Sequence, residues 1–179
     1  MAVSLEKGQR ISLEKEAGKT LTRVVMGLGW DAKKGFFGGG NIDLDASCVM
    51  FGAGKEHRDT VWFKQLASKD GSVTHTGDNL TGAGEGDDER IIVDLGRVPK
   101  EISTLVFTVN SFRGQTFKKI ANAFCRIVDS AGDKEIARYD LSGGADTTAM
   151  IMAKVYRHND EWKMQAIGEP ANGKTFQDL

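Results

Sequence analysis

The sequence NIDLDASCVMF at residues 41–51 decides the fold. Its apolar side chains recur at every second position, which is the spacing of a β-strand that buries one face. The residues on that face are Ile42, Leu44, Ala46, Cys48 and Met50. We therefore predict a strand here, with this face directed into a hydrophobic core.

Segments of the same kind continue on both sides of this strand. Short runs rich in Val, Ile, Thr and Phe are separated by polar turns such as SKDG at residues 68–71. Many short strands joined by such turns favour a sandwich over a parallel βαβ sheet. The other predicted strands are residues 3–13 in two pieces around Gly8, 22–30, 59–64, 72–76, 90–95, 102–112, 125–129, 135–141, 149–160 and 161–169.

One segment shows a helical period instead. Phe117, Ile120, Ala121 and Phe124 recur with the i, i+3, i+4, i+7 spacing of an apolar stripe. This spacing predicts a short amphipathic helix over residues 116–124 that packs on a sheet. The predicted fold is mainly β: an antiparallel β-sandwich with one short amphipathic helix. Residues 1–179 form a single domain in this interpretation, because neither a repeat nor a linker divides the chain.

Composition excludes several classes of function. Lys and Arg total 24 and Asp and Glu total 25, so the net charge of −1 does not favour a nucleic-acid binder. Cys48 and Cys125 form neither a disulfide framework nor a metal-binding pair, which is typical of a cytoplasmic protein. The opening MAVSLEKGQR has no apolar segment, so we expect neither secretion nor membrane insertion.

The strongest local anomaly is an acidic window, DNLTGAGEGDDE at residues 78–89, which contains no basic residue. Carboxylates this close repel one another unless a cation or solvent screens them. The interspersed glycines let the backbone turn its carbonyl oxygens inward, as a calcium ion with about six to eight oxygen ligands requires. The oxygen-bearing side chains are Asp78, Asn79, Glu85, Asp87, Asp88 and Glu89.

A second acidic group precedes this window. Asp31 follows the tryptophan of GLGWD, and Asp43 and Asp45 are two residues apart on one strand face, so their carboxylates stand side by side. A D-x-D pattern alone is more often a solvated strand face than a binding site. The two acidic groups together favour a metal site, whereas His and Cys at zinc-binding spacings are lacking.

Several segments together resemble the TerD-type tellurium-resistance family, in order and over nearly the whole chain. They are GLGWD at 27–31, IDLDAS at 42–47, HTGDNLTGAGEGDDERIIVDL at 75–95, TVNSF at 108–112, FKKIANAFCRIVD at 117–129, ARYDLS at 137–142 and EWK at 161–163.

The resemblance implies a cytoplasmic bacterial stress-response protein with a β-sandwich fold, calcium bound through acidic loops, and no established catalytic activity. It implies two neighbouring calcium ions at the end of the sandwich, where both acidic groups meet. It also implies protein partners in a stress-response complex, which can include association with a membrane. The ligands carried over by position are Asp31, Asp43, Asp45, Asp78, Asn79, Glu85, Asp87, Asp88 and Glu89.

Two other classes of function compete with this hypothesis. An enzyme that uses paired carboxylates needs the two groups in different environments, whereas these acids are pooled and spaced by glycine. A non-catalytic protein is therefore expected. The alternative is a calcium-dependent adaptor for a membrane or a carbohydrate. Cys48 and Cys125 lie in apolar contexts and are predicted to be buried structural residues, and Trp30 is predicted to be a core residue.

Overall fold

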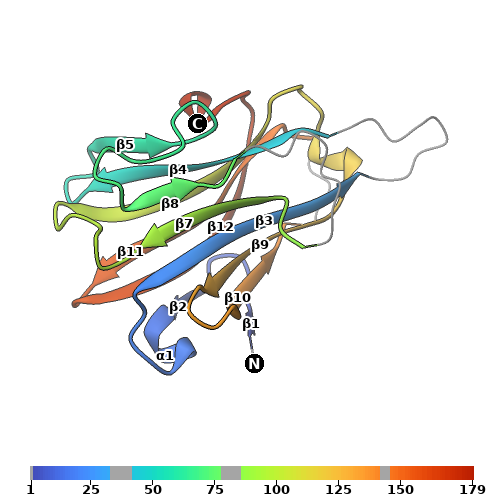
Figure 1. Ribbon diagram of the computed structural model, residues 1–179. Helices are drawn as coiled ribbons and strands as arrows, with labels where there is room; N and C mark the ends of the chain where they lie inside the picture. Colours follow the sequence, from blue (N-terminus) through green and yellow to red (C-terminus); the bar gives the residue numbers. More distant parts are fainter. Residues whose placement is uncertain (1, 33–41, 78–85, 142–145) are drawn as a thin grey trace.

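The computed structural model describes residues 2–32, 42–77, 86–141 and 146–179. It contains two stacked six-stranded sheets (Figure 1). The first, in spatial order, consists of β1 (Val3–Ser4), β10 (Lys134–Asp140), β9 (Ile120–Asp129), β3 (Arg23–Ala32), β7 (Glu89–Asp94) and β6 (Val73–His75). The second consists of β2 (Arg10–Ser12), β12 (Glu161–Ala171), β11 (Ala149–His158), β8 (Ile102–Ser111), β4 (Leu44–Gly52) and β5 (His57–Val61).

The described strands pair antiparallel, except that β1 runs parallel to β10. The predicted β-sandwich is thus confirmed. The core lies between the sheets, and the predicted inner face of β4 belongs to it: Leu44, Cys48 and Met50 are completely buried. Burial of such a side chain contributes about 1.5–3 kcal/mol relative to leaving it in water.

The predicted helix over residues 116–124 is wrong in its position. Only a single 3₁₀ turn, η1 (Phe117–Lys119), forms there, and β9 begins directly after it at Ile120. The segment contains a β-bulge instead: Gly29 and Asp31 of β3 pair with Phe124 and Ala121 of β9, so β9 carries one extra residue. The extra residue places Ala121 and Phe124, three positions apart, on the outward face, whereas Ile120 faces the core, so the residues of the predicted stripe do not share one face.

The short helix of the fold lies elsewhere, in α1 (Leu13–Ala17). The Ser12 side chain caps its first turn by accepting a hydrogen bond from the Lys15 backbone N–H. Gly18 ends it in the left-handed conformation, at φ 71°. This segment was predicted to be strand up to residue 13, because its apolar residues alternate as far as Leu13.

The C-terminal segment covers part of the outer face of the second sheet. Its 3₁₀ turn, η2 (Phe176–Asp178), places the Phe176 ring 5.0 Å from Trp62, edge to face. The same segment contacts β8, where the Asn110 amide donates to the carbonyl of Gly173. This cover explains why the outer face of β4 is buried as well as its inner face.

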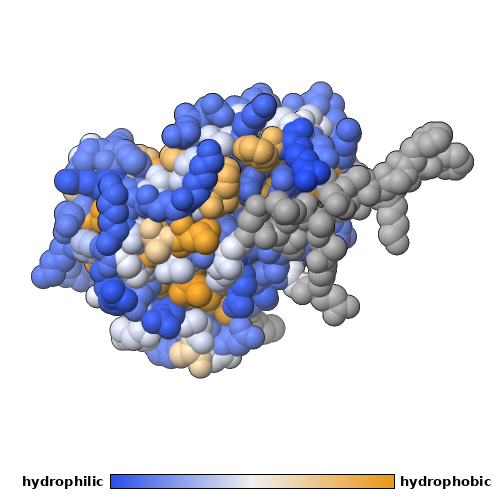
Figure 2. All heavy atoms as spheres, turned by 45° about the horizontal axis from the view of Figure 1, so that its top comes forward, coloured by the Kyte–Doolittle hydropathy of each residue, from blue (hydrophilic) through white to orange (hydrophobic). Residues whose placement is uncertain are grey.

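The surface is mostly hydrophilic, with hydrophobic side chains gathered near the middle of the face that Figure 2 shows. Among the described residues no helix is both long and apolar enough to cross a membrane. Both cysteines are free and buried, as predicted. Burial raises the pKa of both thiols, that of Cys125 to about 12.

Candidate metal centre

The described acidic residues of the predicted site come from three strand ends at one end of the sandwich, on the right in Figure 1. Asp31 lies near the end of β3, Asp43 and Asp45 lie at the start of β4, and Asp87 to Glu89 lie at the start of β7. Because β3 runs antiparallel to β7, the end of one strand meets the start of the other. The fold thus brings acids together that are far apart in the sequence.

Two hydrogen bonds join the sheets at this end. The indole N–H of the buried Trp30 donates to the carbonyl of Ile42 over 3.1 Å. The Ala46 backbone N–H donates to the Glu89 carboxylate over 2.6 Å. Ile42 adjoins Asp43 and Trp30 adjoins Asp31, so the first bond ties two members of the second acidic group together. The bond from Ala46 to Glu89 links that group to the acidic window.

Asp43 and Asp45 are both almost fully buried, at 4% and 5% exposure. The Nε atom of Arg113 lies 3.4 Å from Asp43 Oδ2 and forms an ion pair with it. Asp45 stands opposite Asn110 of β8 in the register, and Asn110 is held by the C-terminal segment. Placing two carboxylates this deeply requires compensation by charge or by hydrogen bonds. The half-exposed Arg113 offsets part of that charge.

Asp88 and Asp31 form the other part of the site. Asp88 Oδ2 accepts a hydrogen bond from the Trp30 backbone N–H over 2.8 Å, and its own N–H donates to the carbonyl of Leu28. Burial raises the pKa of Asp88, and the nearby charges of Asp31 and Asp87 raise it further, against the bond from Trp30. Asp31 itself is exposed, and it accepts from the Asn122 amide over 2.9 Å. A cation here would relieve the crowding of negative charge.

Asp87 has a different environment from its neighbours. Its side chain is only 3% exposed, and Arg126 of β9 binds both of its oxygens, over 2.7 and 3.1 Å. Arg90 approaches from the other side, with its Nε atom 3.7 Å from Oδ2. The bond to Asp87 also raises the pKa of Arg126. Two arginines therefore already neutralise the charge of Asp87.

Two glycines of GLGWD make room for this arrangement. Gly27 pairs with Arg90 on one side and Arg126 on the other, and a Cβ atom there would collide with the Asp87 carboxylate. A Cβ atom at Gly29 would collide with the ring of Phe124 and lie 2.7 Å from the carbonyl oxygen of Gly86. Close packing of residues 86–88 on β3 therefore requires glycine at both positions.

Glu89 is directed into the core, not toward solvent. Besides the bond from Ala46, its Oε2 atom lies 3.2 Å from His75 Nε2, and both side chains are 1% exposed. The other ring nitrogen of His75 accepts from the Gly77 backbone N–H, so the proton of the neutral ring is on Nε2 and points at Glu89. This chain of bonds ties β6, β7 and β4 together.

Three of the predicted ligands, Asp78, Asn79 and Glu85, lie outside the described residues. In the part of the chain that the structure describes, His, Cys, Asp and Glu side chains do not form a group of three or more that could hold a metal ion. Besides Asp87, which two arginines bind, and Glu89, which faces the core, the described acids of the predicted ligand set are Asp31, Asp43, Asp45 and Asp88. All are hard oxygen donors, which fits calcium better than zinc.

Sequence reasoning missed the residues that balance the acids: Arg113, Asn122 and Arg126. For two of these residues the sequence contains a feature that could have indicated their role. Arg126 is a charged residue inside the apolar run AFCRIV, and Arg113 directly follows the strand of TVNSF. Asn122 had none, because its role depends on the bulge, where it adopts φ 52°.

Comparison with known proteins identifies relatives over the full length of the chain. The family model described as TerD domain matches residues 1–179. Tellurium resistance protein TerZ of Serratia marcescens is 48% identical, with 99% of this chain and 94% of that protein covered. Stress response protein SCP2 of Bacillus subtilis (strain 168) is 46% identical, with 100% and 98% covered. Tellurium resistance protein TerD of Serratia marcescens is 44% identical, with 94% and 91% covered.

A solved structure supports the fold. The crystal structure of a homologue of telluride resistance protein (TerD) from Streptomyces coelicolor A3(2) superposes with a TM-score of 0.70. The match covers 89% of this chain and 99% of that one, at 20% sequence identity. The same arrangement of strands is therefore found in a distantly similar sequence.

Proposed function

The chain belongs to the TerD domain family, and from this membership we propose that it is a stress-response protein that binds calcium at the acidic end of the sandwich. In this proposal it acts in the cytoplasm as a non-catalytic module that contributes to tellurite resistance. The names of its relatives, tellurium resistance proteins and a stress response protein, support the biological part of the proposal.

The observation that carries the calcium part is the position of Asp31, Asp43, Asp45 and Asp88 on strand ends at the same end of the sandwich. Two of these carboxylates are almost fully buried, and a third has its pKa raised by burial and by neighbouring acids. A bound Ca²⁺ ion supplies the positive charge that such a group needs. Asp78, Asn79 and Glu85 complete the proposed ligand set, and Arg113 and Arg126 keep the remaining negative charge in balance.

The proposed calcium site also indicates how the protein would act as a binding module. The three contributing strand ends lead into residues 33–41 and 78–85, so an ion bound to their acids would cross-link the segments around them. This cross-link would create a surface for a protein partner only when calcium is present. A partner that recognises this surface would therefore bind in a calcium-dependent way.

The test is thermal unfolding of metal-free protein titrated with calcium or magnesium. Binding at about 100 times the dissociation constant stabilises a fold by about 2.7 kcal/mol, which raises the melting temperature by about 5–10 °C for a chain of this size. We expect this rise with calcium, and a smaller one with equal magnesium.

Single substitutions test whether the calcium-induced rise in melting temperature arises at the proposed site. The substitutions Asp45→Asn and Asp88→Asn should each abolish most of the rise, because each removes one negative ligand. Asp133→Asn is the matched control: Asp133 is exposed in the turn after β9, at the opposite end, with φ 48°, which asparagine also adopts. A calcium response in the two site variants equal to that of Asp133→Asn would refute the proposed site.

A further inference from the structure

The outer face of the second sheet carries a group of basic side chains at the end opposite the acidic site. Strands β2, β12 and β11 lie side by side there, and residues opposite each other across strands share a face. Their register forms two rows, Arg10–Gln165–Lys154 and Ser12–Lys163–Tyr156.

The distance between the two ends follows from the strand register. Ala149 of β11 pairs with Asn110, beside Asp45, whereas Tyr156 lies seven residues further along the same strand. At about 3.3 Å per residue the basic rows are about 20 Å from the acidic end. The two features are therefore separate sites.

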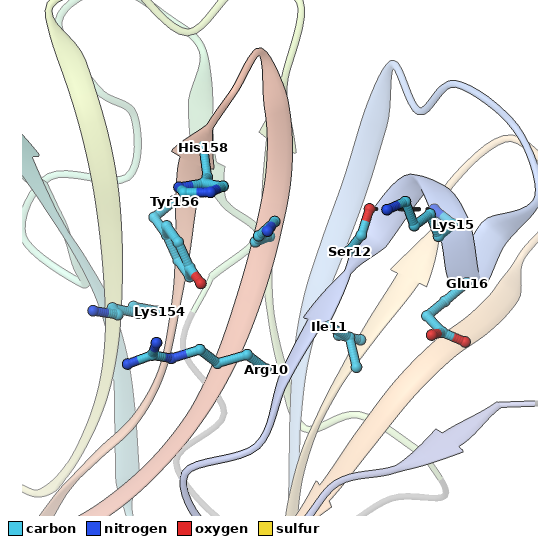
Figure 3. Close-up of a pocket in the computed structure, with 9 residues that line it drawn as sticks. Arg10, Ile11, Ser12, Lys15, Glu16, Lys154, Tyr156 and His158 are labelled. Atoms are coloured by element: carbon cyan, nitrogen blue, oxygen red, sulfur yellow. Dashed lines mark hydrogen bonds between the residues drawn. The ribbon is translucent and has the colours of Figure 1, made fainter.

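These side chains line a pocket of about 490 Å³. Arg10, Lys154 and Lys163 come from the sheet, and α1 forms the opposite wall with Lys15 and Glu16. Figure 3 shows Arg10 extending toward Lys154 and the Tyr156 hydroxyl, with His158 on the other side of the tyrosine. Lys154, Tyr156 and Lys163 are half-buried. Small-molecule sites usually have volumes of about 300–1,000 Å³, and this pocket falls within that range.

The charge in this pocket is not balanced. Within the described residues, Arg10, Lys15, Lys154 and Lys163 form no ion pair with a carboxylate, and Glu16 is the one acidic residue of the lining. The arginines on the other sheet are arranged differently, since Arg126 and Arg90 share the carboxylate of Asp87. Four cations that line one pocket without a carboxylate partner among the described residues repel one another, and an anion bound there would reduce that repulsion.

The other polar groups of the pocket indicate which class of ligand it can bind. The Lys154 ammonium lies 5.1 Å from the centre of the Tyr156 ring, a cation–π distance that holds both side chains against the sheet. The Ser12 hydroxyl is occupied by Glu161 and by the Lys15 backbone N–H. The pocket thus offers a guanidinium fork, several ammonium groups and a phenolic hydroxyl, which are donors typical of phosphate sites.

We infer that this pocket binds a small soluble compound that carries two or more adjacent phosphate groups. The cations come from two walls of the pocket, Arg10, Lys154 and Lys163 from the sheet and Lys15 from α1, so a ligand with two phosphate groups can contact more of them than a single small anion can. The chain has a net charge of −1, and these four cations line one small pocket, which favours a compact polyanion over a nucleic acid.

The experiment measures binding of inorganic pyrophosphate and tripolyphosphate by calorimetry, at low salt and with EDTA present. EDTA removes calcium, so the result is independent of the acidic site. We expect saturable binding, and a tenfold or greater loss of affinity in the double variant Lys154→Gln/Lys163→Gln. The matched control Lys100→Gln/Lys174→Gln removes the same charge from exposed positions outside the pocket and should change affinity by less than twofold.

Further measurements distinguish binding in this pocket from nonspecific attraction to positive charge and from binding to a membrane surface. Tyr156→Phe should weaken binding by a smaller factor, and the melting temperature of each variant in the absence of ligand reports whether it is folded. Vesicles of phosphatidylglycerol test the alternative source of phosphate. Equal losses in the two double variants, or binding to vesicles without binding to pyrophosphate, would overturn the inference.

Discussion

At the scale of single residues, Asp88 has a charge that the fold disfavours in the absence of metal. Its pKa is raised in the folded protein by burial and by Asp31 and Asp87. The protonated form is therefore favoured on folding. The penalty of the charged form is absent below about pH 4, the unfolded value, and it grows as the pH rises from there to the folded pKa.

Asp88→Asn should consequently raise the melting temperature slightly at pH 7 in EDTA. The amide oxygen can still accept from the Trp30 N–H, so the substitution removes the charge and keeps this bond. The difference from wild type should vanish as the pH falls to about 4, and thermal unfolding at a series of pH values checks this. A lower melting temperature than wild type at pH 7 in EDTA would show that the charge of Asp88 stabilises the metal-free fold.

Asp87 has a structural role that can be separated from metal binding. Arg126→Met would leave its buried carboxylate with only Arg90, at a cost of about 1–3 kcal/mol, because Arg126 is itself 28% exposed and partly screened. Urea unfolding in EDTA measures this loss. Arg58→Met, which breaks the exposed pair with Glu56, should cost clearly less than Arg126→Met.

A double-mutant cycle with Asp87→Asn completes the test of this pair. Once the arginine is gone, the neutral asparagine should recover part of the stability lost in Arg126→Met. Additive effects of the two substitutions would mean that the bidentate contact contributes nothing.

At the scale of elements, the bulge of β9 links the sheet to the site. Asn122 adopts φ 52° there, and its amide donates to Asp31. Asn122→Val should destabilise the protein by about 1–2 kcal/mol, because a β-branched residue is strained at positive φ. Asn122→Gly keeps the backbone geometry and loses only the bond to Asp31.

Chemical denaturation of both Asn122 variants compares these effects. The valine substitution should be clearly more harmful than the glycine substitution. The reverse order would indicate that the hydrogen bond to Asp31, not the backbone conformation, accounts for the role of Asn122.

The same bulge limits how far secondary structure can be predicted from the sequence. Alternation identified the inner face of β4 correctly, because a strand with regular pairing keeps period two. Over residues 117–124 the apolar spacing predicts a helix, whereas in the structure the inserted residue puts Ala121 and Phe124 on one face of the strand and Ile120 on the other. A bulge is defined by its partner strand, and the partner is unknown before the fold is known.

At the scale of the whole molecule, the closed sandwich should protect both thiols. Cys48 and Cys125 are completely buried, and burial raises their pKa values. The reactive thiolate is therefore scarce, and native protein should react with a disulfide reagent only through unfolding. Both thiols should react at once in about 6 M guanidinium chloride.

The surface variant Ser130→Cys provides the control for the thiol experiment, since residue 130 is exposed in the turn after β9. Its added thiol should be labelled rapidly in the native state. Equally rapid labelling of Cys48 or Cys125 in the native wild type would show that the sheets open far more often than the packing indicates.

The sequence alone determined the sandwich class, the buried face of β4 and the burial of both cysteines. It also indicated the acids, because pooled carboxylates and glycines are visible as composition. Only the tertiary structure decided how those acids differ: Asp87 is bound by Arg126, Glu89 is buried against His75, and Asp88 is left among negative neighbours. The physical reason is that alternation and propensity act between residues close in sequence, whereas the charge balance of a carboxylate depends on strands that meet only in the fold. The basic pocket likewise exists only through the register of β2, β12 and β11.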